Sequence, residues 1–313
     1  MTDAAITEFF RANQGPDDYA YVLLDPLAEQ SLEPVPLIDV LEDELGSEAI
    51  TRVLRPGYSY DPRRCPALVC LAEPGNAPAV HLVAMTEAQL NADLHRSKRS
   101  VCGWLISEQP PDVIAAHLLS LCMLPTGPGT TRFYPIFEPL RLELLWTMFP
   151  TSSDGPWWPI KSWWVAGSDS ISGPMHGNPE STHAVPVTAH AIQSEAPLVR
   201  RLLDAWRLTQ NQQNRLASVR PSAEETRPIM AAPAALKQLQ QARELGLAMD
   251  EDLLTWALLS WHLHPNLHEH PACKRSLEKC INNLQPLDEL LGQYGDGDWI
   301  RVLAEMNRGE QRP

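Results

Sequence analysis

The segment from His262 to Cys273 contains the residue types that come closest to a metal site. It reads HLHPNLHEHPAC, so four histidines and a cysteine fall within twelve residues. Imidazole and thiolate are ligands that zinc prefers. The spacing matches neither an HExxH helix nor a zinc finger, and both HxH pairs lie beside prolines at an expected helix end. We therefore interpret the segment as a polar turn between helices in which some histidines cap backbone carbonyls. A metal-dependent hydrolase is the alternative.

Two other short motifs have a partial match to known catalytic or binding loops. The sequence GSDS at 167–170 places Ser168 after a glycine, but a nucleophile elbow needs GxSxG at a strand-to-helix turn. A serine hydrolase that uses Ser168 is therefore part of the same alternative. The sequence GPGTT at 127–131 has no lysine and leads into an expected strand instead of a helix. It indicates a hairpin or connecting loop.

Strand patterns alternate with helix patterns between residues 19 and 166. The expected strands are 19–24, 67–72, 81–85, 101–106, 131–134 and 160–165. The expected helices are 35–45, 86–97, 110–123 and 136–149, the second opened by a capping box at Thr86. This alternation predicts an α/β domain over residues 1–166 with a mixed, partly parallel sheet.

The rest of the chain has a different character. Residues 167–192 are rich in Gly, Ser, Pro and His, which predicts a linker or long loop. Residues 193–313 contain only helical patterns and predict a smaller all-α C-terminal lobe.

Charge and composition exclude several classes of protein. The net charge is −14, from 25 basic and 39 acidic residues, and nucleic acid phosphates would need a positive surface. No apolar run is long enough to span a bilayer, and the first residues lack the pattern of a signal peptide. The six cysteines form no CxxC pair, which is typical of reduced thiols. We therefore expect a cytoplasmic protein without nucleic acid or membrane as a partner.

Four tryptophans fall within eight residues, in WWPIKSWW at 157–164. Successive residues of a strand point to opposite faces, so only one of Trp163 and Trp164 can enter a core on a single face. One interpretation is that helices cover both faces of the sheet, or that the helical lobe covers the second tryptophan. The other is a protein-docking surface, in which tryptophan is enriched.

Five segments occur in an order that resembles one bacterial family. They are YVLLD at 21–25, CGWLIS at 102–107, HLL at 117–119, RFYPIFEPL at 132–140 and GPWWPIKSWW at 155–164. In their order and spacing the chain resembles the type VI secretion adaptor proteins, also called effector chaperones. It departs from the family pattern at Gly103-Trp104, where the family has Trp-Gly, and at Pro135, where the family has aspartate. The stretch from Phe149 to Pro156 is longer than in the family.

The resemblance implies binding without catalysis and without a cofactor or metal. An adaptor of this family binds a toxic effector in the bacterial cytoplasm and helps to load it onto the VgrG spike. A looser likeness at 242–247 and 266–271 implies a structural role for His268 and His270. A permanent component of a larger assembly, such as a baseplate, is a further hypothesis.

We take six side chains as candidates for partner contact. They are Arg132, Tyr134, Trp157, Trp158, Trp163 and Trp164. For Arg132, the alternative is an ion pair with Glu138 inside the domain.

Overall fold

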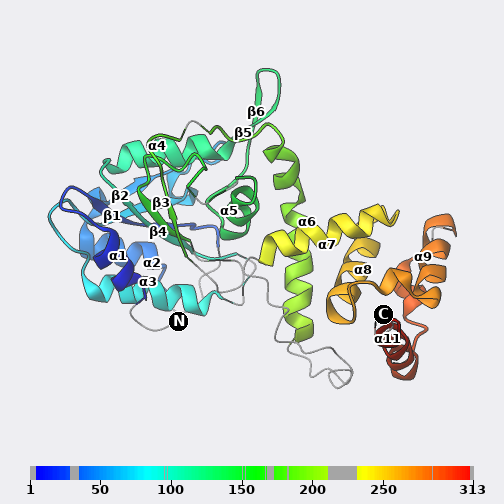
Figure 1. Ribbon diagram of the computed structural model, residues 1–313. Coiled ribbons are helices and arrows are strands. Elements are labelled where there is room, and N and C mark those ends of the chain that lie inside the picture. Colours follow the sequence, from blue (N-terminus) through cyan, green and yellow to red (C-terminus); the bar gives the residue numbers. More distant parts are fainter. Residues whose placement is uncertain are drawn as a thin grey trace. The chain divides into compact units, whose positions relative to one another are not determined.

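A computed structural model describes the chain over residues 5–28, 35–94, 96, 98–149, 151, 153–165, 167, 173–181, 183–210, 231–283 and 285–310. Contacts divide the chain into two compact units, residues 1–196 and 197–313, which we call unit 1 and unit 2. Unit 1 combines strands and helices, whereas unit 2 is helical over its described residues (Figure 1). The predicted combination of an α/β region and an all-α C-terminal lobe is confirmed.

In the described part of unit 1, six strands form one sheet in the order β2-β3-β1-β4-β7-β8. They span Ile50–Arg52 (β2), Ala67–Ala72 (β3), Tyr19–Leu24 (β1), Val101–Ser107 (β4), Ser162–Val165 (β7) and Gly173–His176 (β8). Two further strands, Met123–Gly127 (β5) and Thr130–Phe133 (β6), form a separate hairpin. The hairpin interpretation of GPGTT is thus confirmed.

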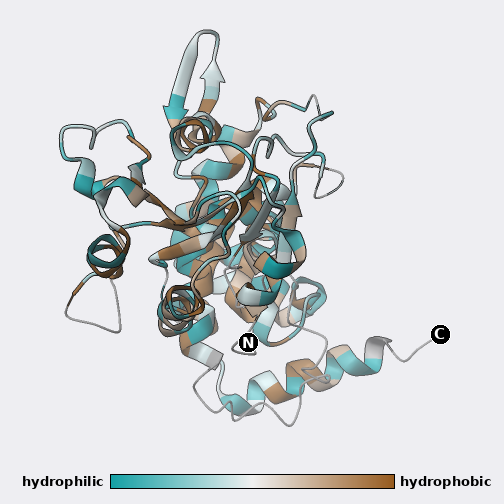
Figure 2. Ribbon diagram, turned by 90° about the vertical axis from the view of Figure 1, so that its left-hand side faces the viewer, coloured by the Kyte–Doolittle hydropathy of each residue, from teal (hydrophilic) through white to brown (hydrophobic). Residues whose placement is uncertain are grey.

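Helices cover both faces of the six-stranded sheet. They are α1 (Ala5–Asn13), α2 (Leu37–Leu45), α3 (Val80–Ala92), α4 (Pro111–Cys122) and α5 (Pro139–Trp146). On one face, α4 and α5 pack on a cluster that contains Tyr21, Leu105, Leu118, Phe137 and Trp163, here called the α4–α5 core. On the other, α1, α2 and α3 pack on a cluster that contains Phe9, Val22, Leu41, Leu90 and Trp104, here called the α1–α3 core. Figure 2 shows the resulting hydrophobic strands between helices.

The prediction of a partly parallel sheet is wrong. Every neighbouring pair of strands in the sheet is antiparallel. The strands have long apolar runs because both faces are buried, and such runs are more typical of parallel sheets. Alternation of strands with helices does not by itself determine direction, because a helical connection can also return the chain to an antiparallel position.

The strand expected at 81–85 and the capping box at Thr86 are also wrong. Both lie inside α3, whose N-cap residue, Ala79, makes no side-chain capping bond. The hydroxyl of Thr86 donates a hydrogen bond to the carbonyl of Val83 and accepts one from Nε1 of Trp104, at 2.8 and 3.0 Å. A short apolar run such as HLVAM has the same appearance in a buried helix and in a strand.

Unit 2 consists of helices over its described residues. They are the end of α6 (Ala189–Gln210), α7 (Ala231–Glu244), α8 (Asp250–His262), α9 (Pro271–Asn283), α10 (Leu287–Leu291) and α11 (Asp296–Glu310). Trp206 of α6 stacks on Trp261 of α8, with 5.4 Å between ring centroids. The segment 167–192, for which we predict a linker or long loop, contains β8 and the first residues of α6. None of the helices described is both long and apolar enough to cross a bilayer.

Gly103 allows β4 and β7 to approach closely. It lies in β4 with a φ of 152°, at a register shift where β4 has one more residue than β1. A Cβ at this position would be 2.5 Å from the carbonyl oxygen of Trp164 and 2.6 Å from Nε1 of Trp163. This bulge also directs Cys102 and Trp104, two residues apart, to opposite cores.

We predict that Gly103→Ala destabilises the protein by about 2–4 kcal/mol, because the new methyl group meets backbone and the φ is unfavourable. Urea unfolding followed by tryptophan fluorescence measures the change. The control is Gly173→Ala in β8, where a Cβ would meet nothing within 4 Å. Equal stability of the two variants would contradict the close-approach argument.

Candidate functional site

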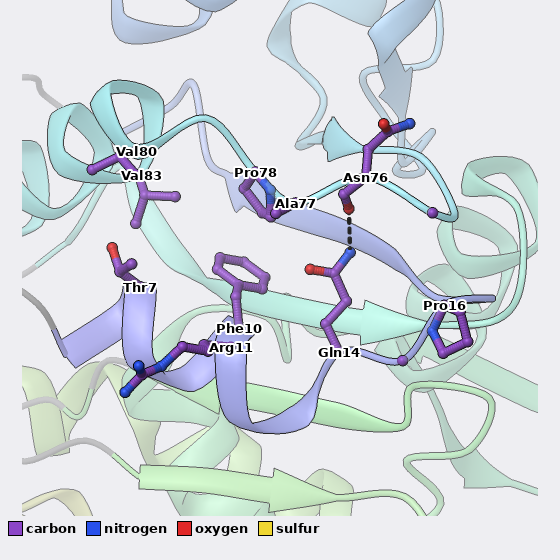
Figure 3. Close-up of a pocket in the computed structure, with 12 residues that line it drawn as sticks. Thr7, Phe10, Arg11, Gln14, Pro16, Asn76, Ala77, Pro78, Val80 and Val83 are labelled. Atoms are coloured by element: carbon purple, nitrogen blue, oxygen red, sulfur yellow. Dashed lines mark hydrogen bonds between the residues drawn. The ribbon is translucent and has the colours of Figure 1, made fainter.

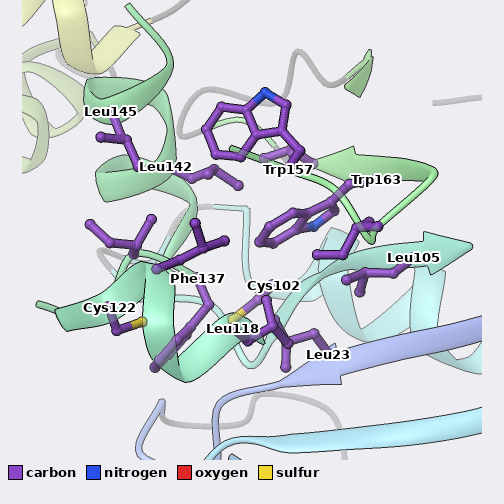
Figure 4. Packing of buried hydrophobic residues seen from close by; sticks show 14 of the residues in the cluster. Leu23, Cys102, Leu105, Leu118, Cys122, Phe137, Leu142, Leu145, Trp157 and Trp163 are labelled. Carbon is purple, nitrogen blue, oxygen red and sulfur yellow. The ribbon is translucent and has the colours of Figure 1, made fainter. Parts of the chain in front are cut away.

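The five segments that carry the family resemblance meet in the α4–α5 core. Tyr21, Cys102, Leu118, Phe137 and Trp163 come one from each segment and all belong to this cluster. Figure 4 shows the labelled side chains Cys102, Leu118, Phe137 and Trp163 directed toward one another between the sheet and α5. The hydroxyl of Tyr21 donates a 2.7 Å hydrogen bond to the carbonyl of Gln109, and burial raises the pKa of its phenol. Tyr21 and Trp163, which are 142 positions apart in the chain, therefore belong to one packed cluster.

Trp157 and Trp163 are core residues. Their side chains are 0 % and 1 % exposed, and Trp157 packs edge-on against Phe149 with 5.5 Å between ring centroids. Both indoles lie among the packed side chains of the α4–α5 core in Figure 4. In this conformation neither tryptophan offers surface to a partner.

Trp164 and Trp158 have different surroundings. Trp164, the next residue of β7, points to the opposite face and meets Phe9 of α1 edge-on at 5.5 Å. The interpretation that helices cover both faces of the sheet is therefore confirmed. Trp158 lies before β7 and is 39 % exposed, so of the four tryptophans it offers the most surface.

Arg132 and Tyr134 lie at the base of the β5–β6 hairpin. Arg132 is exposed in β6, with its guanidinium carbon 5.6 Å from the centroid of the Tyr134 ring. Tyr134 is buried, and its hydroxyl is hydrogen-bonded to Oγ of Ser194 at 3.0 Å. The alternative interpretation, an ion pair between Arg132 and Glu138, is wrong: Glu138 instead pairs with Arg141 at 3.4 Å and with Lys98 at 3.3 Å.

The histidines of the turn at 262–273 in unit 2 form hydrogen bonds with the backbone and with side chains of other helices. His270 precedes α9: its Nδ1 accepts a hydrogen bond from the backbone N–H of Ala272 at 3.2 Å, and its Nε2 lies 3.1 Å from Glu305. Nδ1 of His264 accepts a hydrogen bond from the N–H of Asn266, and His262 is bonded to Thr209. These histidines therefore cap backbone N–H groups at the turn and bridge helices.

Among the described residues, no three His, Cys, Asp or Glu side chains gather as metal ligands would. Ser168 lies outside the described residues.

The structure contains a cleft between α1 and the loop after β3 that the sequence did not predict. It has a volume of about 460 Å³ and an apolar wall formed by Phe10, Pro78 and Val83 (Figure 3). Nε2 of Gln14 closes one end by donating a 2.9 Å hydrogen bond to the carbonyl of Asn76. Arg11 lines the cleft but is paired with Glu8. The signal that could have predicted α1 is the helical spacing of Ile6, Phe9 and Phe10, all buried.

Comparison of the chain with protein-family models, with curated proteins and with solved structures finds no match. The functional argument therefore depends on the residues and their geometry.

We predict that Trp163→Ala lowers the free energy of unfolding by about 3–5 kcal/mol, because it leaves a large cavity in the α4–α5 core. Trp158→Ala should change stability by less than about 1 kcal/mol, because this side chain is part exposed. Chemical unfolding of both variants provides the test. A folded Trp163→Ala variant of unchanged stability would show that the ring is not part of the core.

A second prediction concerns His117, in the HLL segment of α4. Burial lowers its pKa to about 4, although the nearby backbone of Trp157 and Pro156 acts in the opposite direction. Nε2 of His117 is buried without a hydrogen-bond partner, so a proton there would be poorly solvated. Below about pH 6.5 the unfolded chain takes up this proton while the folded chain does not. Stability is therefore lost as the pH falls from about 6.5 toward 4.

We expect His117 to account for a loss on the order of 2 kcal/mol between pH 7.5 and pH 5. Urea midpoints at the two pH values for the wild type and for His117→Gln measure this loss, which the variant should lack. His183→Gln, at an exposed histidine, is the control and should retain the wild-type pH dependence. If His117→Gln retains it as well, the assignment to His117 is wrong.

Proposed function

We propose that this chain is a cytoplasmic adaptor that binds a type VI secretion effector and helps to load it onto the VgrG spike. The observation that carries the proposal is the meeting of all five family-like segments in the α4–α5 core. Apolar segments can resemble a family by chance of composition. The five segments also stand in the order in which the family has them, and their joint packing in one core supports the likeness from which the role is proposed.

The departures from the family pattern lie beside buried residues of both cores. Gly103 stands where β4 and β7 approach closely, and its neighbour Trp104 fills the α1–α3 core. Pro135 follows Tyr134 at the passage from β6 to α5, and Ile136 and Phe137 then enter the α4–α5 core. At both positions the side chains that follow are buried in a core of unit 1.

The cysteines support a reducing compartment. All six are free thiols, and five of them are buried. Burial raises the pKa of Cys70 to about 11 and that of Cys122 to about 12. These thiols are protonated at neutral pH and unreactive toward oxidants. Such a set of thiols matches the bacterial cytoplasm, where the effector would be held before secretion.

Unit 1 offers two surface features to a protein partner. The β5–β6 hairpin projects at the top of Figure 1 and carries the exposed residues Thr130, Thr131 and Arg132. The other is Trp158, whose part-exposed indole can supply the kind of aromatic anchor that dominates many interfaces. We assign partner contact to Arg132 and Trp158, and a structural role to Tyr134, Trp157 and Trp163. Trp164 contributes to the α1–α3 core.

We predict that the tagged chain, co-expressed with VgrG and with the effector encoded beside it, elutes with the effector as a stoichiometric complex in size-exclusion chromatography. Trp158→Ala and Arg132→Ala should each weaken this complex about tenfold without loss of stability, because each removes a contact from the exposed surface. Tyr60→Ala is the control, since Tyr60 is an aromatic residue of unit 1 that is 77 % exposed.

Absence of a complex between a folded chain and a soluble effector would contradict the proposal. Permanent presence of the chain in the purified secretion machine would instead favour a structural component. If the complex forms but the two variants bind like Tyr60→Ala, effector binding stands and the assignment of Arg132 and Trp158 is wrong.

A further inference from the structure

A groove of about 550 Å³ lies in unit 2, between the α7–α8 turn and the end of α9. This volume is within the range of roughly 300–1,000 Å³ that is usual for binding clefts. Leu247, Met249 and Ile281 supply much of its apolar lining, and the start of α10 closes one side. Leu247 is buried, but Met249 is 66 % exposed and Ile281 is 39 % exposed. Two large apolar side chains thus face solvent in one depression of the surface.

The turn that forms one wall is specified by Gly246. The backbone N–H of Gly246 donates to the carbonyl of Arg243 at 2.8 Å, and that of Leu247 donates to Ala242 at 3.3 Å. These two bonds are those of a Schellman motif, which needs a left-handed residue, and φ of Gly246 is 97°. A Cβ on Gly246 would be 3.2 Å from Cδ1 of Ile281. Glycine therefore lets the turn contact α9, and Gly246 and Ile281 line the groove side by side.

Asp252 holds the opposite wall in place. Its Oδ1 accepts a 2.8 Å hydrogen bond from the backbone N–H of Leu287, which is the first residue of α10. Cys280 lies between the walls, and burial raises the pKa of its thiol to about 11, with a further contribution from the charge of Asp252. The thiol is thus neutral and adds to the apolar floor. Both walls are preformed by bonds within unit 2.

The charged side chains that line the groove all have the same sign. Glu251, Asp252, Asp288 and Glu289 contribute carboxylates, and the lining includes neither Lys, Arg nor His. Glu251 is paired with Arg201 of α6 at 2.6 Å, and Asp252 accepts the hydrogen bond from the backbone of Leu287. Asp288 and Glu289 are exposed at the start of α10. An acidic segment would be repelled here, whereas a basic one would be attracted.

From the apolar floor and the acidic rim we infer that the groove binds a segment of the effector in which apolar side chains stand beside Lys or Arg. The apolar side chains pack on Leu247, Met249 and Ile281, and the cations lie against Asp288 and Glu289. This inference rests on the proposed function, because it names the part of the same partner that unit 2 recognises. Burial of the exposed apolar groups supplies affinity, and the charges select the partner.

The test compares matched variants in the effector complex. Ile281→Asp places a charge in the groove, and its control Ile300→Asp changes an isoleucine of α11 that is 43 % exposed. Met249→Asp is paired in the same way with Leu208→Asp, at an α6 leucine that is 69 % exposed. We expect the groove variants to bind the effector about tenfold more weakly and the controls to bind like the wild type. Thermal unfolding checks that all four fold.

Charge is tested separately. Asp288→Lys combined with Glu289→Lys should weaken the complex about tenfold, whereas Glu278→Lys, at an exposed residue of α9, should not. In fluorescence polarisation, a labelled peptide KLLKLLK should bind the wild-type chain and ELLELLE should not. Ile281→Asp should abolish binding of KLLKLLK, and Ile300→Asp should retain it.

The outcomes separate the two proposals. If the wild-type chain forms no complex with the effector, the proposed function fails. If the complex forms and every groove variant binds as tightly as its control, the groove inference fails and the proposed function stands. Equal binding of KLLKLLK by Ile281→Asp and Ile300→Asp would also overturn the groove inference. A wild-type dimer that Ile281→Asp converts to a monomer would overturn it as well, because the occupant would be a second copy of the chain.

Discussion

Burial of the sheet on both faces is the constraint on which the rest of unit 1 depends. All seven residues of β4 are buried, with Leu105 in the α4–α5 core and Trp104 in the α1–α3 core. A strand in this position needs large apolar side chains in both directions, and β7 beside it supplies Trp163 and Trp164. Because Gly103 lacks a side chain, the two strands can approach while the Trp163 indole lies against the backbone.

The same constraint explains which parts of the fold could be predicted. The strands β1, β3, β4 and β7 are short apolar runs between turn residues, and for these runs the prediction of a strand is confirmed. Their direction could not be predicted, because double burial produces the same runs in parallel and antiparallel sheets. The prediction of a strand at 81–85, which lies inside α3, was wrong for a related reason. A helix that buries Leu82 and Val83 against a sheet has an apolar run like that of a strand.

Whether the candidate residues contact a partner stays a prediction, but the structure does show which of them are exposed. Alternation along β7 correctly places Trp163 and Trp164 on opposite faces, but local sequence does not determine how deeply each side chain is covered. Trp157 and Trp158 are adjacent, yet one is fully buried and the other is 39 % exposed. The groove of unit 2 was inaccessible to sequence reasoning for another reason. Gly246, Ile281 and Asp288 are separated in the chain, and each has an ordinary local role as helix cap, helix residue or first-turn acid.

The groove of unit 2 is lined by carboxylates, and the whole chain also has a net negative charge. Twelve of the 39 acidic residues fall in the first 50 positions, all of them in unit 1, and the net charge of the whole chain is −14. At physiological ionic strength the field of exposed charges is screened within about 8 Å, so the net charge favours a basic partner without determining where it binds. Short-range packing must therefore determine where the partner binds. Met249 and Ile281 supply packing surface beside carboxylates, and this combination gives a basic, apolar segment a specific binding position on an otherwise acidic chain.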